Sequence, residues 1–375
     1  MTVILALIAI AFLLIFVHNV KSFNNLPWLD ASEQKKTSVF CPSVSIIVAA
    51  RNEADIIERT LVSLQRIDYP DFEIILINDQ SSDDTAEIAA LIAAKDSRLS
   101  IIDSEDLPSG WIGKSWALHQ GVKHARGEWL LFTDADCIHH PQSLRIAMTL
   151  VFDSELDFVS IIPKLEQVNS GGKLIMPAYV TLLGTFFPLG KLNVHPNKAL
   201  AAGGFILVKR SIYQAVGGHF AIRGSLLDDV SLACRVKAFS YSVWTGLTRD
   251  LVVTRPYESL KAIWIALGRH AFDLMERSVM RVIIFLIGLM LMVGLPMVGL
   301  VVSAVSMSPL VLILAMVSMG IMILVGIGST KLLGIGWLWG LILPIGFLLY
   351  GGIVVTAVVQ FWRGKLVWSG RQYGR

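Results

Sequence analysis

Long apolar stretches near both ends constrain what this chain can fold into more than any other feature. Residues 3–20 form the first stretch, and residues 282–305, 310–327 and 333–360 form three more. About 20 consecutive apolar residues suffice for a helix that crosses a bilayer. Charged residues make up only 16% of the chain, against about 25% in an ordinary soluble domain. We therefore expect one membrane-spanning helix within residues 1–22 and about three within residues 281–361.

The first stretch also indicates on which side of the membrane the following residues lie. A cleaved signal peptide is the alternative, but no basic residue precedes the stretch and no small-residue cleavage site follows it. Lys21, Lys35 and Lys36 come after it. Since basic residues favour the cytoplasmic side, we expect a multi-pass protein of the inner (plasma) membrane whose central residues, 40–258, face the cytoplasm.

The basic tail, residues 362–375, conflicts with a simple count of crossings. It carries Arg363, Lys365, Arg371 and Arg375, which favour the cytoplasmic side. Three crossings after a cytoplasmic domain would instead place the tail outside. Either one stretch is not a simple crossing, as Pro344 in the last one allows, or the tail departs from the rule.

Residues 174–192 are also long and apolar enough to cross a bilayer. Pro177, Gly184, Pro188 and Gly190 make this stretch a poor regular helix. A single crossing would also place the polar motifs before and after it on opposite sides of the membrane. We therefore expect an interfacial or buried segment.

Residues 40–258 alternate between strand and helix patterns. Strands are expected at residues 44–49, 72–77, 99–102 and 129–132, and helices at residues 54–65, 85–94 and 115–125. This alternation predicts βαβ units in a mostly parallel, Rossmann-like α/β fold. Such sheets bind ligands at the carboxyl ends of their strands.

Two carboxylates with one spacer, Asp134 and Asp136, follow the strand at residues 129–132. They can direct their oxygens at one hard cation, Mg²⁺ or Mn²⁺, which usually shares such ligands with substrate phosphates. A lone Asp-x-Asp is weak support, because such triplets are common in loops.

Polar residues also follow the first two strands. Ala50, Arg51 and Glu53 come after the first, and Asp79 follows the second within residues 78–85. Asp83 or Asp84 there has the alternative of a helix N-cap. Three successive strands ending in polar tips on one sheet edge are much more specific than any single motif.

Residues 48–53, 78–85 and 133–136 together resemble the ordered motifs of family 2 glycosyltransferases, which have the GT-A fold. The resemblance implies that Ala50, Glu53 and Asp79, with Arg51 beside them, bind the nucleoside of a nucleotide-sugar donor. It also implies that Asp136, together with Asp134, holds the metal and the donor diphosphate.

A closer resemblance comes from residues 107–117, LPSGWIGKSWA, which are similar to the hopene-associated and carotenoid-associated subgroup of these enzymes. Residues 222–229 and 368–373 add to it. Lys114 in this motif is a candidate contact for the donor diphosphate. Its alternative is a solvated lysine at the start of a helix.

Asp228 and Asp229 form a second acidic pair. Sugar transfer needs a base for the acceptor hydroxyl, and adjacent carboxylates can raise one pKa toward neutrality. The family resemblance assigns the base to Asp229, supported by Asp228, and a single displacement then predicts inversion at the anomeric carbon. The alternative is a helix N-cap. Gly203 and Gly204 resemble a turn on the acceptor side of related enzymes, with a plain turn as the alternative.

Residues 265–271 depart from the pattern of many processive relatives. Where those carry Gln-x-x-Arg-Trp, this chain has Arg269 followed by His270. Arg269 is a candidate cation for the diphosphate, but the missing tryptophan weakens a reading as a polymer synthase. Trp264, Phe272 and Met275 fit an amphipathic helix at the membrane surface within residues 259–280.

These features predict a membrane glycosyltransferase with a lipid acceptor, since residues 40–258 are tied to the membrane at both ends. The subgroup resemblance implies a hopanoid or carotenoid acceptor and a UDP-sugar, and it leaves the sugar open. A polyprenyl-phosphate or ceramide-like lipid is an alternative, with Arg223 and Arg235 near Asp229. A catalytically silent membrane scaffold is disfavoured because every required carboxylate is present.

Net charge and cysteine spacing argue against some other classes of protein. A net charge of +3 is too small to imply nucleic acid. Cys41, Cys137 and Cys234 lie far apart without a Cys-x-x-Cys pair, which argues against a zinc site or a disulfide framework.

Overall fold

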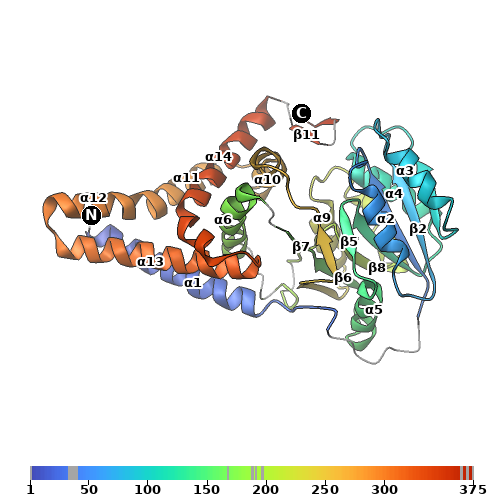
Figure 1. The fold of residues 1–375 in the computed structure, drawn as a ribbon, viewed down its shortest axis with the longest axis horizontal. Helices are drawn as coiled ribbons and strands as arrows, with labels where there is room; N and C mark the ends of the chain where they lie inside the picture. The colour runs from blue at the N-terminus through green and yellow to red at the C-terminus, as the bar shows by residue number, and fades with distance from the viewer. Residues whose placement is uncertain are drawn as a thin grey trace. The chain divides into compact units, whose positions relative to one another are not determined.

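The structure is a computed structural model that describes residues 2–32, 41–166, 169–186, 190, 192–195, 198–363, 366–368 and 371–373. Lys35, Lys36, Pro188, Lys365 and Arg375 therefore lie outside the described residues. The chain divides into two compact units. We call residues 26–166 and 191–255 the sheet unit, and residues 1–25, 167–190 and 256–375 the helical unit (Figure 1).

A seven-stranded sheet forms the centre of the sheet unit, in the order β3-β2-β1-β4-β8-β6-β9. Its strands are β1 (Val44–Ala50), β2 (Phe72–Asn78), β3 (Leu99–Asp103), β4 (Trp129–Asp134), β6 (Phe158–Ile162), β8 (Ile206–Lys209) and β9 (Val243–Leu247). Neighbours pair in parallel except at β8, which is antiparallel to both β4 and β6. The predicted mostly parallel α/β fold is confirmed.

Helices and a smaller sheet complete the sheet unit. The helices are α2 (Ile57–Gln65), α3 (Thr85–Ala93), α4 (Gly113–His124), α5 (Ser143–Asp153), α7 (Arg210–Ala215), α8 (Gly218–Ala221) and α9 (Asp228–Ala238). The smaller sheet joins β5 (Cys137–His139), β10 (Val252–Thr254) and β7 (Lys164–Leu165).

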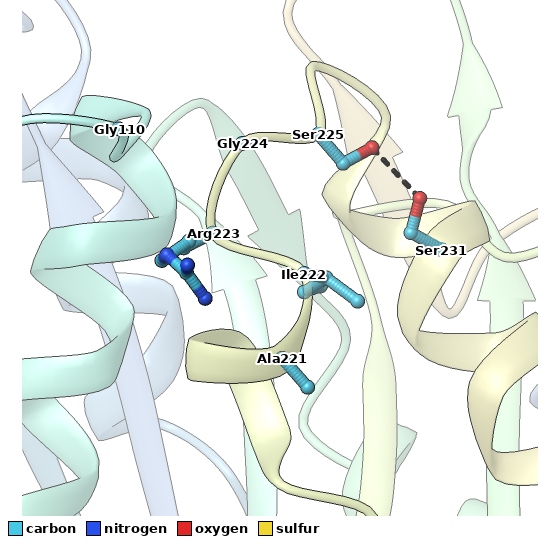
Figure 2. A pocket seen from close by; sticks show the side chains of 7 residues that line it. All are labelled: Gly110, Ala221, Ile222, Arg223, Gly224, Ser225 and Ser231. Carbon is cyan, nitrogen blue, oxygen red and sulfur yellow. Dashed lines mark hydrogen bonds between the residues drawn. The ribbon is translucent and has the colours of Figure 1, made fainter.

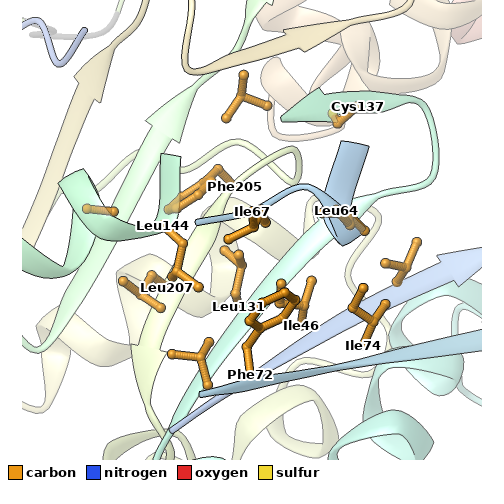
Figure 3. Packing of buried hydrophobic residues seen from close by; sticks show 14 of the residues in the cluster. Ile46, Leu64, Ile67, Phe72, Ile74, Leu131, Cys137, Leu144, Phe205 and Leu207 are labelled. Atoms are coloured by element: carbon orange, nitrogen blue, oxygen red, sulfur yellow. The ribbon is translucent and has the colours of Figure 1, made fainter. Parts of the chain in front are cut away.

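Both faces of the main sheet are buried. Ile46 belongs to a cluster with Leu64 of α2 and Leu144 of α5 (Figure 3). Its neighbour Ile47 belongs to a second cluster with Leu118 of α4. Successive strand side chains point to opposite faces, so a strand covered on both sides needs a continuous apolar run. This is why apolar and polar residues do not alternate along β1 and β2.

Several predicted boundaries differ from the structure near the polar strand ends; strands β1, β2 and β3 each continue one residue further than predicted. The first helix begins at Ile57 rather than at residue 54, because the amides of Ile56 and Ile57 first close a turn onto the carbonyl of Glu53. The third helix begins at Gly113 rather than at residue 115. Strand β4 continues through Asp134, since it stays paired with β1 to that point.

The sheet unit also begins earlier than the predicted boundary at residue 40. The amide of Leu29 donates to the carbonyl of Leu247 at 2.8 Å. Asp30 forms an ion pair with Arg249 and accepts its backbone N–H at 2.7 Å. Residues 26–32 are therefore part of this unit, while residues 167–190 and 256–258 belong to the helical unit.

The helical unit contains α1 (Thr2–Asn24), α6 (Ser170–Phe186), α10 (Leu260–Leu274), α11 (Val279–Leu289), the π-helical turn η2 (Met290–Gly294), α12 (Leu295–Ser306), α13 (Pro309–Leu332), the 3₁₀ turn η3 (Trp337–Ile342) and α14 (Leu343–Trp362). A hairpin of β11 (Leu366–Trp368) and β12 (Arg371–Tyr373) follows. Four helical runs are long and apolar enough to cross a membrane: Thr2–Ser22, Val279–Ser306, Pro309–Leu332 and Trp337–Trp362. Their number matches the sequence prediction.

Helix α6 covers most of the stretch predicted to be a poor helix. It runs 17 residues through Pro177 and Gly184. The prediction of a poor regular helix is therefore wrong for residues 174–186, where packing buries Ile175, Met176 and Ala178. Tertiary packing here outweighs helix propensity.

Candidate active site

The polar tips of β1, β2 and β4 lie together at one edge of the sheet, as predicted. Ala50 pairs in register with Asn78 on one side, and Ala49 pairs with Asp134 on the other. The amide of Asp79 donates to the carbonyl of Ala50 at 2.8 Å. The side chain of Ala50 is buried, so this residue presents its backbone to the edge.

Arg51 ties the loops after β1 and β2 together. Its guanidinium donates to the carbonyl oxygens of Asp79 at 2.6 Å and Gln80 at 3.2 Å. Asn52 and Gln80 both adopt a left-handed backbone with φ of 55°. Non-glycine residues rarely adopt this conformation outside turns that the surroundings fix. The two loops therefore form one braced wall.

The carboxylate of Asp83 joins the loops after β1 and β2. Its carboxylate accepts from the amide of Thr85 at 3.1 Å, the Thr85 hydroxyl at 2.5 Å and the amide of Ala54 at 3.1 Å. Burial opposes the charged form, but these hydrogen bonds lower the pKa of Asp83 below its ordinary value. The residue at the N-cap of α3 is Asp84, which forms no side-chain cap hydrogen bond, so Asp83 does not occupy the capping position.

Glu53 lies among the charges at the strand ends. Burial, followed by the nearby charge of Asp136, raises the pKa of Glu53 from 4.5 to about 7, while Arg255 acts against the shift. Its amide donates to the hydroxyl of Thr85 at 2.8 Å, which fixes the start of the loop. Glu53 is therefore partly protonated near neutral pH in the free protein.

Asp134 and Asp136 fit a hard divalent cation. Their oxygens and the sulfur of Cys137 lie within 4.8 Å of one another. Burial and the charge of Asp134 raise the pKa of Asp136, so a cation there would relieve an unfavourable pair of charges. Burial keeps the Cys137 thiol protonated by raising its pKa, which makes it a poor ligand. Two carboxylates that share a site with phosphate oxygens suit Mg²⁺ or Mn²⁺.

Lys114 lies between the two acidic pairs. Its ammonium nitrogen is 2.5 Å from Oδ1 of Asp134 and 3.8 Å from Oδ2 of Asp228. Burial alone would lower the pKa of Lys114, but Asp134, Asp228 and Asp229 outweigh it and raise that pKa. The side chain is only 19% exposed. The alternative of a solvated lysine at a helix start is therefore wrong.

Asp229 is held in place by two backbone amides. The amide of Gly203 donates to Oδ2 at 3.1 Å, and the amide of Val230 donates to Oδ1 at 2.8 Å. Burial and the adjacent Asp228 raise the pKa of Asp229, whereas Lys114 lowers it. The residue that precedes α9 is Leu227, which forms no side-chain cap, so the acidic pair does not occupy the capping position.

Gly203 allows the two acidic pairs to approach each other. A Cβ at this position would lie 2.6 Å from Nζ of Lys114 and 2.8 Å from Oδ2 of Asp134. Gly204 is tied to β4, because its carbonyl accepts from the hydroxyl of Thr133 at 2.8 Å. The turn thus contacts the site directly through its first glycine.

An open pocket of 480 Å³ lies beside the segment that leads into Asp228 and Asp229. Figure 2 shows its lining residues: Gly110, Ala221, Ile222, Arg223, Gly224, Ser225 and Ser231. The amide of Ile112 donates to the carbonyl of Arg223 at 2.8 Å, which joins the loop before Lys114 to this wall. The exposed Arg223 stacks on Phe220 at 5.0 Å, whereas Arg235 donates to the carbonyl of Val216.

Arg255 is a residue of this site that the sequence reading missed. Its amide donates to the carbonyl of Asp136 at 3.0 Å, and its guanidinium lies 3.8 Å from Oδ2 of Asp55. It stands directly after β10, which pairs with β5. Because that pairing joins segments far apart in the chain, no local motif marked this arginine.

Arg269 belongs to α10 in the helical unit. Its assignment to the donor therefore stays a prediction. The side chain of His270 lies outside the described part of the structure.

A mostly parallel sheet whose strand ends carry an acid pair that fits a divalent cation, with a buried base candidate on a neighbouring helix, is typical of a GT-A type nucleotide-dependent transferase. Residues 45–217 match the family model described as glycosyl transferase family 2. This match covers a little less than half of the chain and supports a glycosyltransferase of this family.

Two groups of relatives add to this result. The chain is 27% identical over 225 residues to a poly-beta-1,6-N-acetyl-D-glucosamine synthase of Staphylococcus epidermidis, covering 60% of this chain and 51% of that protein. It is 28% identical over 224 residues to the protein of the same name in Staphylococcus aureus, covering 59% and 50%. The chain thus spans about half the length of these relatives.

A solved structure shares the fold over nearly the whole chain. It is the mannosyltransferase PcManGT from Pyrobaculum calidifontis in complex with GDP-Man and Mn²⁺, with a TM-score of 0.56 and 18% identity. The similarity covers 95% of this chain and 98% of that one. It supports the GT-A fold together with the helices at both ends.

Proposed function

We propose that this protein is an inverting membrane glycosyltransferase that transfers a sugar from a nucleotide-diphosphate sugar, a UDP-sugar, to a hydroxyl of a lipid acceptor. The observation that carries the proposal is the placement of Asp229. Two backbone amides orient its carboxylate, and burial beside Asp228 raises its pKa. A general base works best when its pKa lies near the operating pH.

The chemistry follows from this base. The acceptor oxygen attacks the anomeric carbon while its proton passes to Asp229, and the bond between that carbon and the diphosphate oxygen breaks. The nucleoside diphosphate leaves from the opposite face, so the anomeric configuration inverts. Lys114 is the cation that this chain itself supplies for the departing diphosphate, since it already contacts Asp134.

Asp136 and Asp134 would hold the divalent cation, Mg²⁺ or Mn²⁺. When bound, that cation neutralises charge on the donor diphosphate. The raised pKa of Asp136 supports this assignment, because two close, buried carboxylates are unfavourable without a counter-charge.

The loops after β1 and β2 are proposed to bind the donor. Ala50, Arg51, Glu53 and Asp79 form the nucleoside side, braced by the Arg51 hydrogen bonds. Arg255 is proposed as a second diphosphate contact, because its backbone is bonded to Asp136. An arginine offers planar, bidentate recognition of phosphate oxygens. Arg269 of α10 is also proposed to bind the donor.

The acceptor is proposed to be a hopanoid or carotenoid that reaches Asp229 from the membrane. Four apolar helical runs support membrane attachment, and basic residues after the first run favour a sheet unit in the cytoplasm. The pocket beside Ser225 and Ser231 offers room next to the base. Gly203 and Gly204 are proposed to line the acceptor side.

Two other acceptors have a specific observation in their favour. The similarity to poly-beta-1,6-N-acetyl-D-glucosamine synthases favours a growing sugar chain. The exposed Arg223 on the pocket wall favours a polyprenyl phosphate, whose phosphate it would bind.

One assay separates these acceptors. Purified protein is incubated with radiolabelled nucleotide sugars and Mn²⁺, and with a hopanoid or carotenoid fraction, a polyprenyl phosphate or a sugar oligomer. Label in the hopanoid or carotenoid fraction, lost in Asp229→Asn, is the expected result. Transfer to soluble or polymeric sugars alone would contradict the lipid acceptor.

A further inference from the structure

The last apolar helix does not cross the membrane in the arrangement of the helical unit. We propose that three segments cross, namely α1, the run from α11 to α12, and α13, whereas η3 and α14 enter the bilayer and return to the side where the chain joins the sheet unit. Length and hydropathy qualify all four runs. Packing within the helical unit distinguishes the last of them.

Helices α1 and α13 begin at the same level. Gly299 of α12 lies between their first two turns, since a Cβ there would be 3.1 Å from Cδ1 of Leu5 and 3.2 Å from Cβ of Ala315. Only two residues, Met307 and Ser308, join α12 to α13. These two helices therefore form an antiparallel hairpin (Figure 1), and α13 runs parallel to α1.

The ends of α1 and α13 also meet, through α6. Asn19 donates to the hydroxyl of Thr185 at 3.1 Å. One turn earlier in α6, the hydroxyl of Thr181 is 2.7 Å from that of Ser329. Because the chain passes from α1 into the sheet unit at Leu26, α13 ends on the side of the membrane where the sheet unit begins.

Helix α14 ends on that same side. The ring of Phe361 lies 5.1 Å from the ring of Phe272 in α10, and the guanidinium of Arg277 lies 5.3 Å over Phe361. Helix α10 begins five residues after Arg255, the last residue of the sheet unit, and leads to the start of α11 at Val279. The segment after α13 thus starts and finishes on one side.

The contacts between α14 and α11 show how deep the middle of α14 lies. Tyr350 faces Phe285 at 6.2 Å, and a Cβ at Gly351 would be 2.9 Å from Leu289. Leu289 is about 15 Å along α11 from its start, at 1.5 Å per residue. The hydrocarbon core is about 30 Å thick, so these contacts lie near its middle rather than at its far side.

The beginning of the segment is folded back on α13. Gly340 of η3 packs so closely on Gly326 that a Cβ on either would overlap the backbone of the other. A Cβ at Gly346 in α14 would lie 2.5 Å from the carbonyl oxygen of Leu174 in α6. Half of the last apolar run is buried, against 28% to 33% of the other three, as expected for a helix covered by α6, α10 and α11.

This arrangement also accounts for the basic tail. Arg363 and Arg371 then lie on the side of the sheet unit, together with Arg277 and Arg281. Residues 282–330 contain no charged residue, which leaves the α12–α13 turn free of positive charge on the opposite side. Both sides then obey the tendency of basic residues to stay in the cytoplasm.

Thiol labelling of the full-length protein tests the proposal. Met307→Cys marks the α12–α13 turn, where Met307 is 85% exposed. Lys95→Cys marks an exposed position of the sheet unit, and Arg363→Cys the exposed end of α14. A membrane-impermeant maleimide is applied to spheroplasts and to inverted vesicles, and labelled peptides are identified by mass spectrometry. Wild type reports the background from Cys41 and Cys234.

We expect Arg363→Cys to be labelled in the same preparation as Lys95→Cys, and Met307→Cys in the other. Labelling of Arg363→Cys together with Met307→Cys would overturn the proposal. Fusion of alkaline phosphatase or of green fluorescent protein after Arg375 gives a second readout that needs no accessible thiol. If cysteines at positions 95 and 363 are both labelled in spheroplasts, α14 is still re-entrant. In that case only the cytoplasmic orientation in the proposed function is wrong.

Discussion

The ammonium group of Lys114 lies 2.5 Å from Oδ1 of Asp134 and 3.8 Å from Oδ2 of Asp228. One cation at the start of α4 thereby connects the acid pair that ends β4 with the acid pair that begins α9. Without it, buried like charges would face one another across the site. The two halves of the proposed reaction, release of the diphosphate and deprotonation of the acceptor, therefore meet at a single side chain.

Replacing Lys114 should weaken donor use and move the pH profile. In Lys114→Ala we expect the donor KM to rise tenfold or more, about 1.4 kcal/mol. Lys114 lowers the pKa of Asp229, so the acid limb of kcat/KM should shift to higher pH. Lys95→Ala, an exposed lysine, is the control. If Lys114→Ala folds normally and its acid limb is unchanged, Lys114 does not influence the pKa of the base.

Asp229→Asn should remove the base while keeping the fold. We expect kcat to fall about 10²- to 10⁴-fold, the usual contribution of a general base, with the melting temperature close to that of wild type. Radiolabelled sugar transfer and circular dichroism measure the two effects. Glu87→Gln, an exposed acid on α3, should leave both unchanged. Substantial turnover in Asp229→Asn would assign the base elsewhere.

Gly203→Ala should impair activity through geometry alone. The new methyl group would lie within 2.6 Å of the Lys114 ammonium and 2.8 Å of the Asp134 carboxylate. A misplacement of about 1 Å at a reacting centre can cost on the order of 10²-fold in rate. The matched control is Gly320→Ala in α13, where a Cβ would have no neighbouring atom within 4 Å. Equal activity of the two variants would show that the site does not require a glycine at position 203.

The acid pair should couple metal binding to stability. With Mn²⁺ and UDP present at about 100 times their dissociation constant, bound ligand should stabilise wild type by about 2.7 kcal/mol. We expect Asp136→Asn to lose most of this thermal shift and most of its turnover. Chelation should stop turnover in wild type, and added Mn²⁺ should restore it. Full turnover in chelator would exclude the role assigned to the pair.

Glu53 should make the metal-free protein less stable as pH rises. Its folded pKa of about 7 exceeds the ordinary 4.5, so the folded state binds more protons between these values. The free energy of unfolding then decreases from pH 5 to pH 8. Glu53→Gln should show a smaller decrease, measured by chemical unfolding in detergent with chelator. An identical pH dependence in both proteins would contradict the raised pKa.

Local sequence patterns determined the class of fold and the ends of its strands. The continuous apolar runs of β1 and β2 and the polar residues after them follow from a sheet covered on both faces. The residues Asp79, Asp134 and Asp136 were found at the strand ends because parallel strands end at one edge. Helix starts were less predictable, since turns such as the one closed on Glu53 depend on neighbouring loops.

Only the tertiary structure decided which distant groups meet. Arg255 reaches Asp136 through the pairing of β10 with β5, and Gly203 orients Asp229 by an amide hydrogen bond. Composition alone gave four candidate crossings. The packing of Phe361 on Phe272 places the end of α14 beside α10. Hydropathy measures the preference of a segment for lipid, whereas contacts between helices determine where that segment begins and ends.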